Sequence, residues 1–314
     1  MLDIVTLGEL LIDLTQKGTD ENGNGKFVAY PGGAPANVAV AAARLGAKTG
    51  FIGKVGKDAF GKSLAATLRN EGVDVTGLYV SDKVPTTLAI VSVDETGERE
   101  FSFYRNPGAD TQLEPAEAIA ALKELPLILH VGSLSMTTSP GKEACIEAVR
   151  YAKENGALIS YDPNYRAALW DSEEHAIEMM KVLLPMADIL KVSDEEMAML
   201  TGTDDYEKGS QILSDYGISL VLVTLGADGV FVRCGDMAES VPGFSVQVAD
   251  TNGAGDTFFG AMLCQLAAKS KEEDNGLDFD ELRHFVTYAN KAASITCSRS
   301  GAIPAMPTAD EIIL

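Results

Sequence analysis

The sequence predicts an α/β fold, in which a three-layer, doubly wound and mostly parallel sheet carries helices on both faces and a small β-sheet forms a lid. Three observations lead to this prediction. Short β-branched segments alternate with amphipathic helical segments, and 46% of the 314 residues are hydrophobic, enough for a large core. Two further segments interrupt the alternation with strand–turn–strand patterns.

The alternation is followed along the chain in order. Each β-branched segment is expected to be a strand and each amphipathic segment the helix that returns the chain, as in βαβ units. The expected strands are 3–8, 48–55, 125–133, 158–164, 188–193 and 219–229, and the expected helices are 37–47, 60–72, 143–156, 175–187 and 195–202.

The two interrupting segments, 12–30 and 85–105, are expected to be antiparallel hairpins that pair into one small sheet. The second has the turn-like sequence DETGE at 94–98 between two alternating strands. The chain is thus predicted to divide into a main domain of residues 1–11, 31–84 and 106–314 and a lid of 12–30 and 85–105. A small sheet beside an active-site cleft can act as a lid that excludes water.

Charge and cysteine usage narrow the function classes. The 46 acidic residues outnumber the 25 basic ones, and a formal net charge of −21 disfavours nucleic acids and anionic membranes as partners. The four cysteines and three histidines are widely spaced, without the pattern of a zinc site or a disulfide framework. A soluble, cytoplasmic protein is expected, in which any anionic substrate needs local positive potential.

The strongest local signal is the segment DTNGAGDTFFGAM. Asp250 is expected to close a strand, Gly253, Ala254 and Gly255 to form a tight turn, and a helix to begin at about Asp256. Free backbone amides at a helix N-terminus bind phosphate, and a carboxylate there accepts a proton from an alcohol. The alternative interpretation is ordinary helix capping by Asp or Thr.

The second signal is PGGAPANVAVAAARLGA, in which Gly32 and Gly33 precede small residues and Asn37 on the first turn of an alanine-rich helix. Exposed peptide groups and one amide side chain supply the paired donors and acceptors that a polyol needs. The glycines also suit a simple chain turn, and the alanines suit close helix packing.

Together the two segments resemble the ribokinase-like, or PfkB-type, family of carbohydrate kinases, and the resemblance runs from GELLIDL to TCSRSGAIP, over nearly the whole chain. FYRNPGADTQL and DPNYRAALW are most similar to fructokinases, which implies phosphorylation of D-fructose by ATP to D-fructose 6-phosphate. The resemblance implies Asp256 as general base, beside an anion hole at Gly253, Ala254 and Gly255.

The resemblance also implies roles for other residues. The sugar side would be formed by Asp13, Gly32, Gly33, Asn37, Arg105, Asn164, Arg166 and Asp256. The ATP side would be formed by Lys191, Ser193, Thr224, Gly226, Ala227, Gly229, Gly255 and Asn290.

Metal sites follow from the same resemblance. The family's Asn-x-x-Glu motif reads Ser193-Asp194-Glu195-Glu196 here, so Glu196 is expected to hold Mg²⁺ through water although the asparagine is absent. The alternative is an acidic first turn of a helix. A potassium ion is implied near Asp250, Asn252 and the loop from Arg299 to Gly301.

Other functions remain open at this point. Residues 56–63, GKDAFGKS, match the phosphate-binding pattern of P-loop NTPases, although Asp58 places a carboxylate inside the cradle. Arg105 and Arg166 suit an acidic sugar, so a 2-keto-3-deoxygluconate kinase or another PfkB-type sugar or nucleoside kinase is the main alternative, and both arginines also suit surface ion pairs. A sensor without turnover is a further class. Unpaired edges of the lid sheet favour a homodimer.

Overall fold

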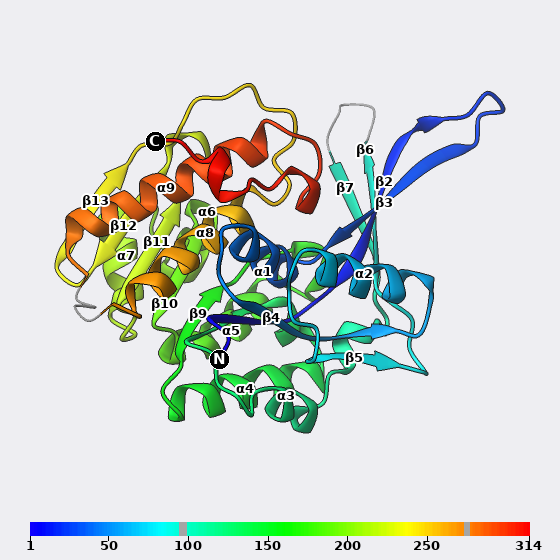
Figure 1. The fold of residues 1–314 in the computed structure, drawn as a ribbon, viewed down its shortest axis with the longest axis horizontal. Helices are drawn as coiled ribbons and strands as arrows, with labels where there is room; N and C mark the ends of the chain where they lie inside the picture. Colours follow the sequence, from blue (N-terminus) through cyan, green and yellow to red (C-terminus); the bar gives the residue numbers. More distant parts are fainter. Residues whose placement is uncertain (94–98, 273–276) are drawn as a thin grey trace.

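The computed structural model describes residues 1–93, 99–272 and 277–314, and a nine-stranded sheet forms its centre (Figure 1). Seven neighbouring strands are parallel, and β12 and β13 add an antiparallel edge. In spatial order the strands are β13 (Met237–Val241), β12 (Val230–Cys234), β11 (Leu220–Thr224), β10 (Ile189–Ser193), β9 (Leu158–Asp162), β8 (Ile128–Gly132), β1 (Ile4–Leu7), β4 (Thr49–Gly56) and β5 (Leu78–Ser81).

Helices cover both faces of this sheet, as a doubly wound fold requires. One face packs against α3 (Pro115–Ala121), α4 (Gly141–Glu154), α5 (Glu173–Leu183), α6 (Asp194–Thr201) and α7 (Tyr206–Ser214). The other face packs against α1 (Ala34–Arg44), α8 (Ala254–Lys269) and α9 (Phe279–Cys297), and α2 (Ala59–Asn70) adjoins α1. The predicted three-layer architecture is confirmed.

Helix α8 occupies the centre of its layer. It contacts α1 on one side and α9 on the other, and side chains from Asp256 to Cys264 are buried all round the helix. A helix that is apolar on every side is stable only inside a protein. Its N-terminus is therefore fixed by packing on three sides. No helix in the described ranges is long and apolar enough to cross a membrane.

A second, four-stranded sheet projects from the main body (Figure 1). It pairs the antiparallel hairpin of β2 (Leu11–Thr19) and β3 (Gly25–Gly32) with that of β6 (Leu88–Val93) and β7 (Arg99–Tyr104), through parallel pairing of β2 with β6. The two β-rich segments thus form one small sheet, as expected. The turn predicted at 94–98 lies outside the described residues, and the division into a main domain and a lid stays a prediction.

The parallel strands all end at the same edge of the main sheet, which is where ligands bind in open α/β folds. The ends of β9, β10 and β11 bring Asp162, Ser193 and Thr224 to this edge. One local expectation is wrong: Asp250 closes no strand, because β13 ends at Val241 and irregular chain follows. Helix α8 begins at Ala254, two residues before the expected start.

Candidate active site

The turn before α8 leaves backbone amides open at the helix start. Gly253 adopts a φ of 75°, and a Cβ built on it would lie 2.9 Å from the Cβ of Ala302, so glycine is required. The first amides of a helix have no intrahelical acceptor, and those of Gly255 and Asp256 donate to no protein group in the described residues. The turn and the helix dipole together favour an anion here.

Asp256 is the carboxylate at this turn, and it is 7% exposed. Its Oδ2 accepts a 2.8 Å hydrogen bond from Nδ2 of Asn37, so the two sequence motifs meet across α8 and α1. Burial raises the pKa of Asp256 to about 6, and Asp162 adds to the rise. The hydrogen bond from Asn37 and the charges of Lys191 and Arg166 oppose it. A buried carboxylate of raised pKa is the usual property of a general base.

The two glycines before α1 allow close approach of separate chain segments. A Cβ on Gly33, whose φ is 112°, would lie 2.4 Å from the carbonyl oxygen of Glu9, and a Cβ on Gly32 would lie 2.3 Å from Oδ2 of Asp13. The position of Gly33 therefore requires glycine, and a side chain at Gly32 would displace the carboxylate of Asp13. The packing of the two glycines brings Glu9 and Asp13 beside the start of α1.

A small polar cavity of about 100 Å³ lies between these elements. Burial raises the pKa of Asp13, one of its carboxylates, to about 6. Asn164 adopts a φ of 48°, and its backbone N–H donates to Asp162 at 3.1 Å. The cavity is lined by Glu9, Leu11, Asp13, Gly33, Ala34, Asn37, Phe103, Leu134, Asn164, Arg166, Asn252, Gly253, Asp256 and Ala302.

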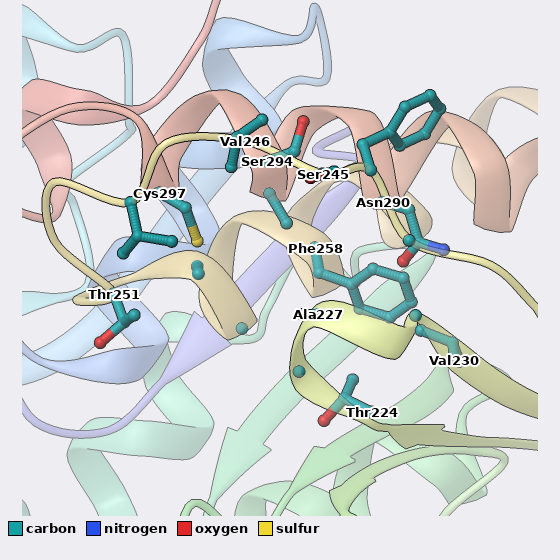
Figure 2. A pocket seen from close by; sticks show the side chains of 18 residues that line it. Thr224, Ala227, Val230, Ser245, Val246, Thr251, Phe258, Asn290, Ser294 and Cys297 are labelled. Atoms are coloured by element: carbon teal, nitrogen blue, oxygen red, sulfur yellow. The ribbon is translucent and has the colours of Figure 1, made fainter.

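A larger cavity of about 380 Å³ lies on the other side of the turn (Figure 2). Its walls are mostly apolar, with Phe258 and Val230 near Asn290. The amide of Asn290 donates to the carbonyl oxygen of Pro242 at 3.1 Å, which holds the loop 242–248 over α9. The lining comprises Thr224, Gly226, Ala227, Gly229, Val230, Gly243, Phe244, Ser245, Val246, Val248, Thr251, Ala254, Gly255, Phe258, Asn290, Ala293, Ser294 and Cys297.

The four residues of the GAGD turn divide between the two cavities. Ala254 and Gly255 line the large cavity, whereas Gly253 and Asp256 line the small one. One short turn therefore separates the two cavities.

A buried ion pair supports this turn. Nζ of Lys191 lies 2.7 Å from Oδ2 of Asp162, and a Cβ built on Gly255 would lie 3.5 Å from the same Nζ. Burial opposes the charged form of Lys191, but Asp162, Glu196 and Asp256 outweigh it and raise its pKa. Lys191 itself lines neither cavity in this structure.

Glu196 forms the capping box of α6 with Ser193. Its Oε2 accepts from the backbone of Ser193 at 2.8 Å, and its Oε1 accepts from the backbone of Tyr165 at 2.7 Å. Burial and the nearby Asp162 raise its pKa. Each oxygen retains a second lone pair, which suits a metal-bound water. Within the described ranges no group of three or more metal-binding side chains gathers.

The two predicted sugar arginines have different surroundings. Arg166 lines the small cavity and is exposed. Arg105 does not line it, because its guanidinium pairs with Asp110 at 2.6 Å and donates to Thr137 and Leu134. Arg105 thus anchors the end of β7 in this structure.

The residues expected around potassium gather only in part. Asp250 accepts hydrogen bonds from the backbones of Asn252 and Gly301, and these three residues line a cavity of about 50 Å³ beneath β3. The side chain of Arg299 lies outside that cavity and pairs with Glu311.

The P-loop-like segment lies between β4 and α2 but is filled by its own carboxylate. Asp58 accepts from the backbone of Gly61 at 2.8 Å and from the backbone of Thr86 at 2.8 Å. A Cβ on Gly61 would lie 2.1 Å from the carbonyl oxygen of Gly56, so the loop has no room for a phosphate. The segment anchors the chain before β6 instead.

Sequence reasoning missed Glu9 and Asp162, although both lie in motifs that it used. Their position at or just beyond the carboxyl end of a parallel strand of the central sheet was the available signal. The loop 243–248, and Ala293, Ser294 and Cys297 of α9, carried no such signal, because none of them lies at the end of a parallel strand.

Comparison with known proteins identifies relatives over nearly the full length. Residues 1–309 match the pfkB family carbohydrate kinase description. Fructokinase-1 of Oryza sativa subsp. japonica is 42% identical over 99% of this chain and 96% of its own. The Xylella fastidiosa fructokinase with bound ATP superposes with a TM-score of 0.90 at 34% identity, covering 99% of this chain and 97% of the other.

A Vibrio cholerae O395 fructokinase double mutant, in a fructose, ADP and potassium ion bound form, gives a TM-score of 0.88 at 34% identity over 99% of this chain and 97% of its own. The family resemblance inferred from the two glycine-rich motifs is therefore confirmed. This chain belongs to the pfkB family of carbohydrate kinases.

Proposed function

We propose that this protein is an ATP-dependent fructokinase, which transfers the γ-phosphoryl group of ATP to D-fructose and yields D-fructose 6-phosphate and ADP. The observation that carries the proposal is the GAGD turn, because Asp256 lines one cavity while Ala254 and Gly255 of the same turn line the other. A phosphoryl group in the large cavity and a hydroxyl group in the small one would meet there. Relatives named fructokinase support this substrate.

ATP is proposed to occupy the large cavity. A volume of about 380 Å³ lies within the range of small-molecule sites, and apolar walls suit a purine base. Asn290 and the loop 242–248 would border the base, and Thr224, Gly226, Ala227 and Gly229 would border the sugar and phosphates. Lys191 and the open amides of the turn would supply the positive potential that a chain of charge −21 needs.

Fructose is proposed to occupy the small cavity. Asp13, Asn37 and Asn164 offer acceptors and donors at fixed positions, which a polyol requires. Three carboxyl groups, those of Glu9, Asp13 and Asp256, line this cavity with only one arginine, Arg166. This balance disfavours an anionic sugar acid and favours a neutral sugar. Arg105 would join the sugar only if it left Asp110.

The proposed phosphoryl transfer follows from the positions of Asp256 and of the turn between the two cavities. Ionised Asp256 accepts the proton of the attacking hydroxyl group while the oxygen of that hydroxyl group bonds to the γ-phosphorus. The bond between that phosphorus and the β,γ-bridging oxygen breaks, and the electron pair leaves with ADP. The amides of Gly255 and Asp256 hydrogen-bond the transferring phosphoryl oxygens. Such a transfer needs positioning and electrostatics and no covalent intermediate.

Two metal ions, magnesium and potassium, are proposed to bind beside this site. The remaining lone pairs of Glu196 would hold magnesium-bound water, and magnesium in kinases is bound mostly by substrate phosphates and water. Magnesium would neutralise phosphate charge. Asp250, Asn252 and Gly301 surround the small space suited to a potassium ion, whereas Arg299 would contribute only its backbone.

The test is a coupled assay of ADP formation with ATP and a panel of fructose, ribose, 2-keto-3-deoxygluconate and nucleosides. Fructose is expected to give the highest kcat/KM. Preference for the sugar acid would reassign the substrate, ADP release without any sugar would indicate an NTPase, and binding without turnover would indicate a sensor. Omission of magnesium, and of potassium, tests the two ions separately.

Assembly and location are proposed as well. The exposed side chains of Phe27 and Val28 on β3 and Tyr104 on β7 favour a homodimer through the small sheet, which light scattering tests. All four cysteines are unpaired, which suits the reducing cytoplasm.

A further inference from the structure

Glu9 links the carboxyl end of β1 to the start of α1. It follows β1, is 3% exposed and lines the small cavity. Its Oε1 accepts a 2.8 Å hydrogen bond from the backbone of Ala34, the first residue of α1. Gly33, the N-cap residue, has no side chain to cap this helix, so Glu9 takes that function.

The second carboxyl oxygen of Glu9, Oε2, does not take part in capping α1. Oε2 is buried and has no hydrogen-bond partner in the described residues, and the same is true of Oδ1 of Asn37. Both residues line the small cavity, whereas Thr6, Thr49 and Trp170, which also carry a buried unpaired atom, do not. An unpaired buried acceptor is costly, and at a cavity it indicates a missing donor.

The missing donor is identified by the chemistry of the cavity. Two unpaired acceptors, Oε2 of Glu9 beside the start of α1 and Oδ1 of Asn37 on its first turn, match a ligand with several hydroxyl groups. We propose that Glu9 is a further substrate-binding residue, whose Oε2 accepts a hydrogen bond from a non-reacting hydroxyl group of the bound sugar. This inference rests on the proposed function and adds a specificity determinant to it.

The environment of Glu9 gives the proposal a second consequence. Burial raises the pKa of Glu9 to about 7, and Asp110 adds to the rise, whereas the backbone N–H groups of Glu9 itself and of Ala34 and the charge of Arg105 oppose it. The thiol of Cys145 is the neighbouring titratable group on α4, and Asp13, Asp256 and Arg166 line the same cavity. A donor from the sugar favours the ionised form of Glu9, so sugar binding at neutral pH is expected to release protons.

The principal variant is Glu9→Gln, which keeps the size of the side chain and an oxygen for the backbone of Ala34. KM for fructose is expected to rise about tenfold, because a hydrogen bond to a charged group is lost, while KM for ATP stays within about twofold. Glu117→Gln is the matched control, since Glu117 also accepts a backbone N–H at a helix start, at 2.9 Å, but lies outside the small cavity. It should leave both KM values unchanged.

The contacted hydroxyl group is found with deoxyfructoses that each lack one non-reacting hydroxyl. One analogue should lose about tenfold in kcat/KM with the wild type and less than about twofold with Glu9→Gln, because the contact is already absent. Equal losses in both proteins for every analogue would overturn the proposal. If Glu9→Gln also raised KM for ATP, or greatly lowered the thermal midpoint of unfolding, Glu9 would act only as a helix cap. Either result would overturn the proposal too.

Calorimetry of fructose binding without ATP separates this inference from the proposed function. Wild-type protein is expected to release protons on binding at pH 7, measured in two buffers of different ionisation enthalpy, and Glu9→Gln to release fewer. A wild type that binds fructose without turnover refutes the kinase assignment alone. Equal fructose affinity and equal proton release in the two proteins refute the role of Glu9.

Discussion

Lys191 and Asp162 form a buried ion pair beneath the GAGD turn, with 2.7 Å between Nζ and Oδ2 and side-chain exposures of 6% and 2%. Asp162 ends β9 and Lys191 lies within the neighbouring strand β10, so the sheet itself sets their distance. The pair lies below Gly255 and close enough to Asp256 to influence its pKa. It therefore links the stability of the fold to the electrostatics of the site.

Removal of one partner of this pair is expected to be costly. Lys191→Met leaves the carboxylate of Asp162 buried and uncompensated, so the free energy of unfolding should fall by about 3 kcal/mol or more. The double variant Lys191→Met with Asp162→Asn should recover most of that stability but not the turnover. Denaturant titration measures the first effect and the coupled assay the second. Recovery of activity by the double variant would show that Lys191 acts only through the fold.

Asp256→Asn is expected to reduce kcat by about 10² to 10⁴-fold, since an amide cannot accept the hydroxyl proton. KM for fructose should change little, because Asn37 keeps a hydrogen-bonding partner at that position. The coupled assay with purified variant measures both constants. If the substitution raised KM and left kcat unchanged, Asp256 would be a binding residue and not the group that accepts the hydroxyl proton.

The raised pKa of Asp256, about 6, predicts how activity depends on pH. The protonated form cannot act as a base, so kcat/KM should fall as pH decreases through about 6. Asp13, with a pKa also raised to about 6, is expected to steepen this limb. An acidic limb centred near pH 4, the usual range of an exposed aspartate, would contradict the burial of both groups.

The same raised pKa predicts that the free energy of unfolding decreases as pH rises, whereas activity increases. The folded-state pKa of Asp256 lies above its unfolded value, so the folded state favours the protonated form and loses stability as pH rises from about 4 to about 6. Below pH 4, Asp256→Asn should therefore unfold at about the same denaturant concentration as the wild type. Above pH 6, its free energy of unfolding should exceed that of the wild type by on the order of 3 kcal/mol. A variant less stable than the wild type at pH 8 would refute this.

The P-loop-like segment is expected to be structural. Lys62→Ala should leave turnover nearly intact, because Lys62 is exposed and lines none of the described cavities. Asp58→Ala removes the N-cap of α2 and the bonds to Thr86, which should cost about 1 to 2 kcal/mol of stability. Steady-state kinetics and thermal unfolding of the pair test this. Abolished turnover in Lys62→Ala would restore the P-loop interpretation.

The nucleotide assignment is tested by filling the large cavity. Ala293 lines it from α9, and Ala293→Phe should raise KM for ATP at least tenfold while KM for fructose stays within about twofold. Ala121→Phe on α3 is the control for added bulk, because Ala121 is half-buried like Ala293 but lies outside both cavities. Equal changes in the two KM values would indicate a distorted turn and leave the large cavity unassigned.

The sequence by itself determined the alternation of six parallel strands with their helices, the two hairpins, the GAGD and di-glycine turns and the family, because these depend on local periodicity and on glycine positions. Asp256 and Asn37 were found in this way. Tertiary structure alone decided that they bond to each other, that Asp162 pairs with Lys191, that Arg105 is tied to Asp110, and that Glu9 caps α1. Strand order and helix packing set such contacts between residues distant in sequence, and local patterns carry no record of them.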